Sequence, residues 1–114
     1  MNELKDYVYF HDWELDAIGV SDAKELIISM HYESKRAVAF FSGVSRCALE
    51  HFGMTNIIYE MKIIRPGEAN YERAIAMLAK SEGQSKARGR QIALLSATAG
   101  VELAVEFDAI RLTS

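Results

Sequence analysis

A short stretch near the N-terminus holds the side chains best suited to chemistry. His11, Asp12, Glu14 and Asp16 lie close together, and the single Trp of the chain stands among them. Histidines and carboxylates serve as general acids and bases and as metal ligands. The three acids occupy alternate positions, so on a β-strand they would share one face. We therefore expect a row of carboxylates on one side of a strand, with core residues between them: Trp13, Leu15 and Ala17.

The spacing of these residues argues against a catalytic pair or a metal centre. His11 and Asp12 are adjacent, and adjacent residues of an extended chain point to opposite faces. A metal site would need His11, His31 and His51 to converge, and no HxH, HxxxH or CxxC pattern supports this. Carboxylates two residues apart on a strand are separated by about 6.5 Å, too far for one small cation. We predict no metal and no cofactor, with His11 bonded to backbone at a sheet edge and Asp12 capping a turn or the strand start.

The remaining reactive side chains do not form a catalytic motif. Cys47 follows Arg46 but has no histidine nearby in the sequence, so we interpret it as a small packed side chain. A basic loop, residues 83–90, carries Lys86, Arg88 and Arg90. It lacks the GxxxxGK[ST] phosphate-binding pattern, and a helix precedes it where such a site needs one to follow. The sequence therefore predicts a non-enzymatic protein with a solvated basic loop.

Charge is unevenly distributed along the chain, whose net charge is -3. Residues 1–34 hold eight acids against two lysines, whereas residues 35–90 hold ten basic residues against five acids. An acidic balance argues against nucleic acid as the main partner, because affinity for phosphate needs a local excess of cations. The acidic segment would instead steer a basic protein partner. The alternative is that folding interleaves the two segments and removes the asymmetry.

The length and composition indicate one soluble domain, residues 1–114. The chain has 50% hydrophobic residues, one proline and one cysteine, so it does not resemble a disulfide-stapled secreted module. No signal peptide or membrane-spanning stretch is visible. We expect a cytoplasmic protein with no membrane partner.

The hydrophobic pattern predicts an α+β fold with about six to seven strands in a mostly antiparallel sheet. Strands are expected at 13–20, 25–33, 37–42, 56–64, 91–97 and 101–112, with a connection or short strand between 43 and 55. A bulge is expected near Ala17–Ile18, and a register change near Ala109–Ile110. One amphipathic helix is predicted at 68–82, with an apolar stripe of Tyr71, Ala74, Ile75 and Leu78 that should lie on the sheet.

Three segments resemble a known type of small bacterial protein. The run Tyr9–Leu15 with Ile18 resembles an "FHD…L…I" opening, and the runs Phe41–Val44 and Asn56–Glu60 are similar to "F-x-G-V" and "N-I-I-x-E" segments of the same β-rich type. Proteins of this type often resemble immunity proteins, which neutralise toxins of polymorphic or contact-dependent inhibition systems in the cytoplasm. The resemblance spans roughly residues 7–64. It implies a toxin domain as partner, and many such toxins are basic nucleases.

The leading hypothesis is a non-enzymatic immunity protein that binds a cognate toxin domain through an acidic surface, as a monomer or homodimer. The carboxylates expected to face the toxin are Asp12, Glu14, Asp16, Asp22 and Glu25. The first alternative is a small ligand-binding or metabolic domain with a pocket between helix and sheet, lined by His31, Tyr59 or Tyr71. A further alternative is a structural oligomer built by pairing of strand edges.

Overall fold

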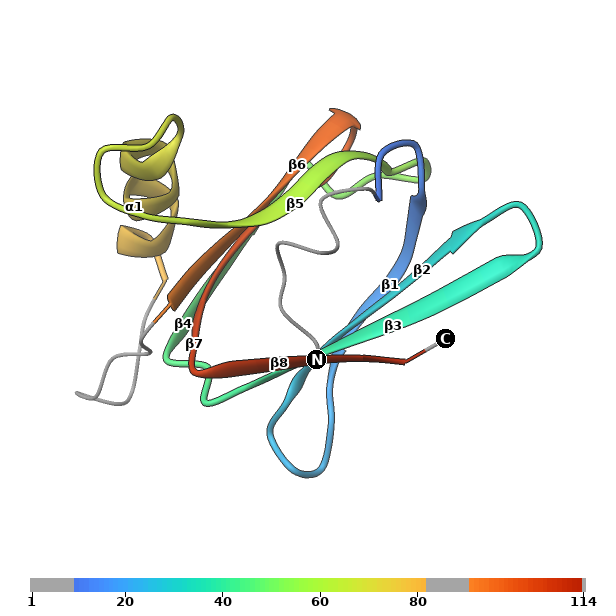
Figure 1. Cartoon of the computed structure of the whole chain (residues 1–114), viewed down its shortest axis with the longest axis horizontal. Coiled ribbons are helices and arrows are strands. Elements are labelled where there is room, and N and C mark those ends of the chain that lie inside the picture. Colours follow the sequence, from blue (N-terminus) through green and yellow to red (C-terminus); the bar gives the residue numbers. More distant parts are fainter. Residues whose placement is uncertain (1–9, 82–90, 114) are drawn as a thin grey trace.

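The computed structural model describes residues 10–81 and 91–113 as an antiparallel sheet with one helix (Figure 1). The predicted α+β class is therefore confirmed, but the sheet has eight strands rather than six to seven. The elements in chain order are β1 (Glu14–Val20), β2 (Leu26–Tyr32), β3 (Lys35–Ser42), β4 (Arg46–Glu50), β5 (Ile57–Ile64), α1 (Tyr71–Ala79), β6 (Gln91–Ala99), β7 (Glu102–Phe107) and β8 (Ala109–Thr113).

The additional strands arise where the chain bends. The segment between 43 and 55 contains β4, and the predicted last strand is divided at Asp108 into β7 and β8. The two bends face each other: Asp108 donates its backbone N–H to the carbonyl of Ser42, at 2.9 Å. Gly43 stands beside Asp108 with a φ of +64°, and a side chain there would collide with the Asp108 carboxylate. Glycine is therefore required at this bend.

The sheet curls until its strands form a closed ring. Its order is β4-β7-β6-β5-β1-β2-β3-β8. Because β3 runs on into β4 and β7 runs on into β8, the two bent segments pair with each other along both halves. The ring is completed between β1 and β5, where Glu14 lies opposite Ile57. Three further backbone hydrogen bonds of 2.8 Å hold this junction, from Asp12 to Ile58, from Ile58 to Trp13 and from Leu15 to Asn56.

The inside of the curled sheet is the main hydrophobic core. Phe41 of β3 and Phe107 of β7 meet edge to face, with ring centroids 4.9 Å apart. The predicted alternation of the last strand is confirmed here, because four alternate residues are buried: Val101, Leu103, Val105 and Phe107. The predicted face of β2 is buried at Leu26, Ile28 and Met30, whereas Tyr32 is exposed.

Helix α1 covers the outer face of the sheet near β4 and β7, at the left of Figure 1. Ala74, Met77 and Leu78 are buried against side chains of β5, β6 and β7. The predicted stripe is thus on the sheet, but the helix spans 71–79 rather than 68–82. Asn70 precedes it with a left-handed φ of 69°, and Lys80 ends it. The side chain of Glu68 accepts a hydrogen bond from the backbone N–H of Arg65, so this residue belongs to a turn.

None of the described segments forms a helix with the length and apolar character to cross a membrane.

A bulge in β1 changes which side chains reach the core. Leu15 pairs with Met30 and Ala17 pairs with Ser29, which leaves Asp16 as an extra residue. The predicted bulge is therefore present, one position earlier than expected. An extra residue shifts the alternation of faces, so Leu15 is buried as predicted, whereas Ala17 is exposed and the expectation that it is core was wrong.

Candidate functional site

The five carboxylates predicted to face a partner fall into two groups. Asp12, Glu14 and Asp16 lie at the start of β1, whereas Asp22 and Glu25 lie at the turn between β1 and β2. The pairing of β1 with β2 fixes this separation, because Glu14 is opposite His31 at one end and Val20 is opposite Leu26 at the other. Asp22 is exposed in the turn, and Glu25 forms an ion pair of 3.3 Å with Arg111. They do not share one surface with the first group.

Within the first group, Glu14 and Asp16 are held by side chains from the next two strands, His31 and Arg36. His31 of β2 contacts Asp16 through Nδ1 at 2.7 Å and Glu14 through Nε2 at 3.3 Å. Arg36 of β3 pairs with the other oxygen of Asp16 at 3.3 Å. Both ring nitrogens of His31 are therefore engaged, which leaves neither facing a substrate as a general base would. The cluster ties three strands together.

Asp12 and His11 form a turn before β1. Asp12 adopts a φ of 70°, a left-handed conformation that Asp tolerates better than most residues. This turn places His11 Nε2 3.4 Å from the Asp12 carboxylate, so the two residues do not point to opposite faces as an extended chain would require. His11 Nδ1 lies 3.1 Å from the carbonyl oxygen of Tyr59, the backbone role predicted for it.

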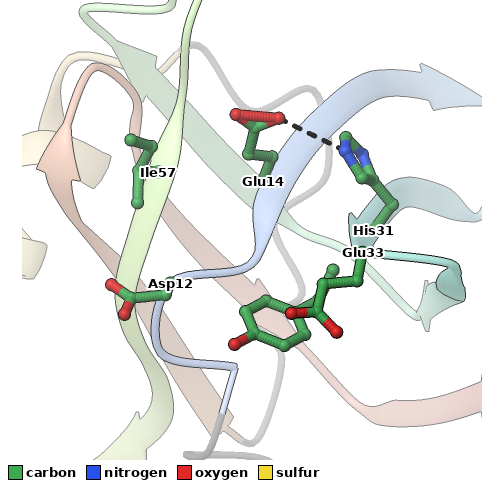
Figure 2. A pocket seen from close by; sticks show the side chains of 6 residues that line it. Asp12, Glu14, His31, Glu33 and Ile57 are labelled. Carbon is green, nitrogen blue, oxygen red and sulfur yellow. Dashed lines mark ion pairs between the residues drawn. The ribbon is translucent and has the colours of Figure 1, made fainter.

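A hollow of 240 Å³ opens between these acids (Figure 2). Figure 2 shows Glu14 and His31 pointing toward each other, while the carboxylates of Asp12 and Glu33 come from two separate turns. Glu33 stands in the turn between β2 and β3 with a φ of 55°. The sequence reasoning missed it, because only the pairing of β2 with β1 brings the two turns together. We call Asp12, Glu14, Asp16 and Glu33 the acidic patch.

Exposed apolar side chains border the acidic patch. Phe52 and Met54 line a second hollow, of 230 Å³, that shares Glu14 with the first. Phe52 is 48% exposed and Met54 is completely exposed, whereas Phe41 is fully buried. Tyr59, also exposed, lies edge to face with His11 at 5.5 Å. The sequence could not separate these aromatic residues from core.

The loop that carries Phe52 and Met54 is fastened by the buried side chain of Asn56. The amide of Asn56 accepts hydrogen bonds from the backbone N–H of Gly53 and Val101, and donates to the carbonyl of Gly53. Gly100, at φ +87°, lets the neighbouring turn approach: a Cβ there would lie 2.5 Å from the Asn56 oxygen. The exposed apolar side chains therefore stand on an anchored loop, a favourable arrangement for binding because little ordering remains to be done.

A second cluster of potential ligands lies at the helix side of the sheet. Among the described residues, one ligand atom each of Glu50, His51 and Glu102 lie within 4.8 Å of one another. Lys80 pairs with Glu50 at 3.2 Å, and Arg73 pairs with Glu102. With both carboxylates already bound to cations, the cluster is an ion-pair network between α1, β4 and β7.

Cys47 is exposed on β4 rather than packed inside. Its sulfur is nonetheless partly shielded from water, and this desolvation raises the pKa of the Cys47 thiol above its usual range. A higher pKa leaves less thiolate at neutral pH, which makes the thiol a weak nucleophile.

The third hollow, of 420 Å³, lies between α1 and the sheet. Tyr71, Arg65 and Gln91 line it together with Glu106. Glu106 is 6% exposed and accepts hydrogen bonds from Ser45 Oγ at 2.6 Å and from two nitrogens of Arg46 at 3.0 Å. The bonded carboxylate raises the pKa of Arg46 above its usual value. This pair is therefore a structural ion pair that forms one wall of the hollow.

The basic loop at 83–90, with Lys86, Arg88 and Arg90, lies outside the described residues.

Comparison of the chain with protein-family models, with curated proteins and with solved structures found no match in any of the three.

Proposed function

We propose that this chain is a non-enzymatic immunity protein that binds a basic toxin domain through the acidic patch. The observation that carries the proposal is the placement of four carboxylates beside the exposed Phe52 and Met54 on one end of the sheet. Protein interfaces combine a few apolar anchors with charged groups that steer the encounter and fix the register. A nuclease-type toxin is basic because its substrate is a polyanion, so an acidic surface can occupy the same site.

The proposal concerns one end of the β1–β2 hairpin, and that makes it testable with matched variants. The double variant Asp12→Asn and Glu33→Gln removes two charges that take no part in the contacts of Glu14 and Asp16 with His31 and Arg36. Its control, Asp22→Asn, removes a carboxylate from the opposite end of the hairpin. Asn is tolerated at the left-handed φ of Asp12, so the fold should be unaffected.

The partner to test is the toxin domain encoded beside this chain's gene. Stopped-flow measurement of association should show that the double variant lowers the on-rate at low salt by about tenfold, because charges at the rim of an interface act mainly on association. The control should bind like the wild type. The acidic-patch proposal fails if the wild type does not bind, or if Asp22→Asn weakens binding as much as the double variant.

The hollow between α1 and the sheet favours a second function, a small ligand-binding domain. Its volume of 420 Å³ lies in the range of small-molecule sites. Of the three residues named for such a pocket, Tyr71 lines this hollow, whereas His31 lines the hollow at the acidic patch and Tyr59 is exposed. A thermal-shift screen of a metabolite library would test this function. A ligand that raises the melting temperature of the wild type but not of Tyr71→Ala would favour it over toxin binding.

A further inference from the structure

One side of β4 has no partner among the residues that the structure describes. β4 pairs with β7 on its other side and forms one end of the strand order. The free side of such a strand presents the backbone N–H and C=O groups of alternate residues, which are a template for another strand. Two side chains of this strand are accessible to a second chain, since Leu49 is 45% exposed and Cys47 is exposed as well.

We propose that two copies of this chain associate through β4, antiparallel, about a two-fold axis at Ala48. This register pairs all five residues of the strand. It places Arg46 opposite Glu50 of the second copy, Cys47 opposite Leu49 and Ala48 opposite Ala48. A two-fold interface must be complementary to itself, and the sequence of β4 meets this condition with one cation and one anion equidistant from its centre.

The charges already on the sheet favour this pairing. Glu50 lies directly opposite Glu102 of β7, so two like charges are neighbours within one copy. Like charges opposite each other are destabilising, and opposite charges are stabilising. Within one copy, Lys80 pairs with Glu50 and Arg73 pairs with Glu102. Arg46 of the second copy would add a further cation on the open side of Glu50. The guanidinium of Arg46 is already oriented by its two hydrogen bonds to Glu106.

The other end of the strand order, β8, is less suited to the same pairing. Self-pairing of β8 about its central residue would place Arg111 opposite Arg111 of the second copy. Arg111 is also engaged with Glu25 and lies 4.0 Å from the centre of the Phe40 ring. The structure therefore assigns the second copy to β4.

Disulfide trapping tests the register. Residues directly opposite in an antiparallel pair have Cα atoms about 4.5 to 5.5 Å apart, within the range that a disulfide spans. Ala48→Cys, made together with Cys47→Ser, should therefore cross-link on mild oxidation. Native Cys47 lies diagonal to its symmetry mate, about 7–8 Å away, so the wild type should not cross-link. Ala109→Cys on β8, in the same Cys47→Ser background, is the matched control and should remain uncross-linked.

Light scattering tests the association itself. The wild type should have twice the monomer mass, and Leu49→Lys should have the monomer mass while circular dichroism shows that it is folded. Val20→Lys changes another exposed apolar residue, far from β4, and should remain a dimer. A monomeric wild type, a dimeric Leu49→Lys, or equal cross-linking of the two cysteine variants would each overturn the proposal. Toxin binding by Leu49→Lys is measured separately, so the two proposals can fail independently.

Discussion

Glu106 shows how one side chain can link distant parts of the chain. It lies on β7, is almost fully buried, and is bonded by Ser45 and Arg46 across the sheet. A buried carboxylate is tolerated only when its partners replace the water that it loses. The ion pair between Arg36 and Asp16 differs from it in burial, since the Arg36 side chain is 70% exposed.

Removing one member of the buried pair should therefore cost much more than removing one member of the exposed pair. We expect Glu106→Ala to lower the free energy of unfolding by about 3 kcal/mol, because Arg46 loses its counter-ion in a shielded place. Arg36→Ala should lower it by about 1 kcal/mol or less, since solvent screens an exposed pair. Urea denaturation of both variants measures the difference, and equal losses would contradict this assignment.

The same scale shows where residue types alone give no answer. Phe41, Phe52 and Tyr59 are all aromatic, yet the first is fully buried and the others are exposed. The sequence shows that all three are hydrophobic. Only the tertiary structure decided which are available to a partner, because it turns Phe41 of β3 into the core and places Phe52 on an anchored loop.

At the scale of elements, α1 is held by its contacts more than by its own hydrogen bonds. Nine residues are too few for a stable isolated helix. Leu78 is fully buried against the outer face of the sheet, whereas Ile75 is only partly buried.

Shortening these two side chains should separate their contributions. Leu78→Ala leaves a cavity between helix and sheet and should cost about 3 kcal/mol of unfolding free energy. Ile75→Ala should cost clearly less, because water can reach the vacated space. Thermal denaturation of the two variants checks the order, and a larger loss for Ile75→Ala would show that the helix packs on a different face.

The strand predictions succeeded where one face is apolar and failed where geometry changes within a run. Alternation located β1, β2, β3, β5 and the last strands. The register change expected near Ala109–Ile110 corresponds to the break at Asp108, one position earlier. The pattern did not show that this break separates two strands, because the bend depends on Gly43, which lies 65 positions earlier in the chain. The helix was predicted too long, since Asn70 and Lys80 fit a helical pattern until the turn geometry is known.

At the scale of the whole molecule, the ring of strands has one weak junction. β1 and β5 share a single paired position and a few backbone hydrogen bonds, whereas β6 pairs along its length with both β5 and β7. Local opening occurs where the fewest contacts must be broken.

Hydrogen exchange should therefore begin at this junction. We expect the amides of Leu15 and Ile58, which bond across it, to exchange faster than those of Leu94 near the middle of β6 and Leu103 in β7. Residue-resolved exchange measured by NMR tests the order. Uniform protection across the four amides would mean that the ring opens only by global unfolding.

The sequence by itself determined the class of fold, the apolar faces of most strands and the stripe of the helix, because periodicity reflects which side of an element is shielded from water. It also placed Asp12, Glu14 and Asp16 near one another. Only the tertiary structure decided that Asp22 and Glu25 stand at the far end of a hairpin and that Glu33 joins the acidic patch. It also decided that one side of β4 has no strand partner within residues 10–81 and 91–113. These features depend on which strands become neighbours, and neighbours are chosen by contacts between residues far apart in the chain.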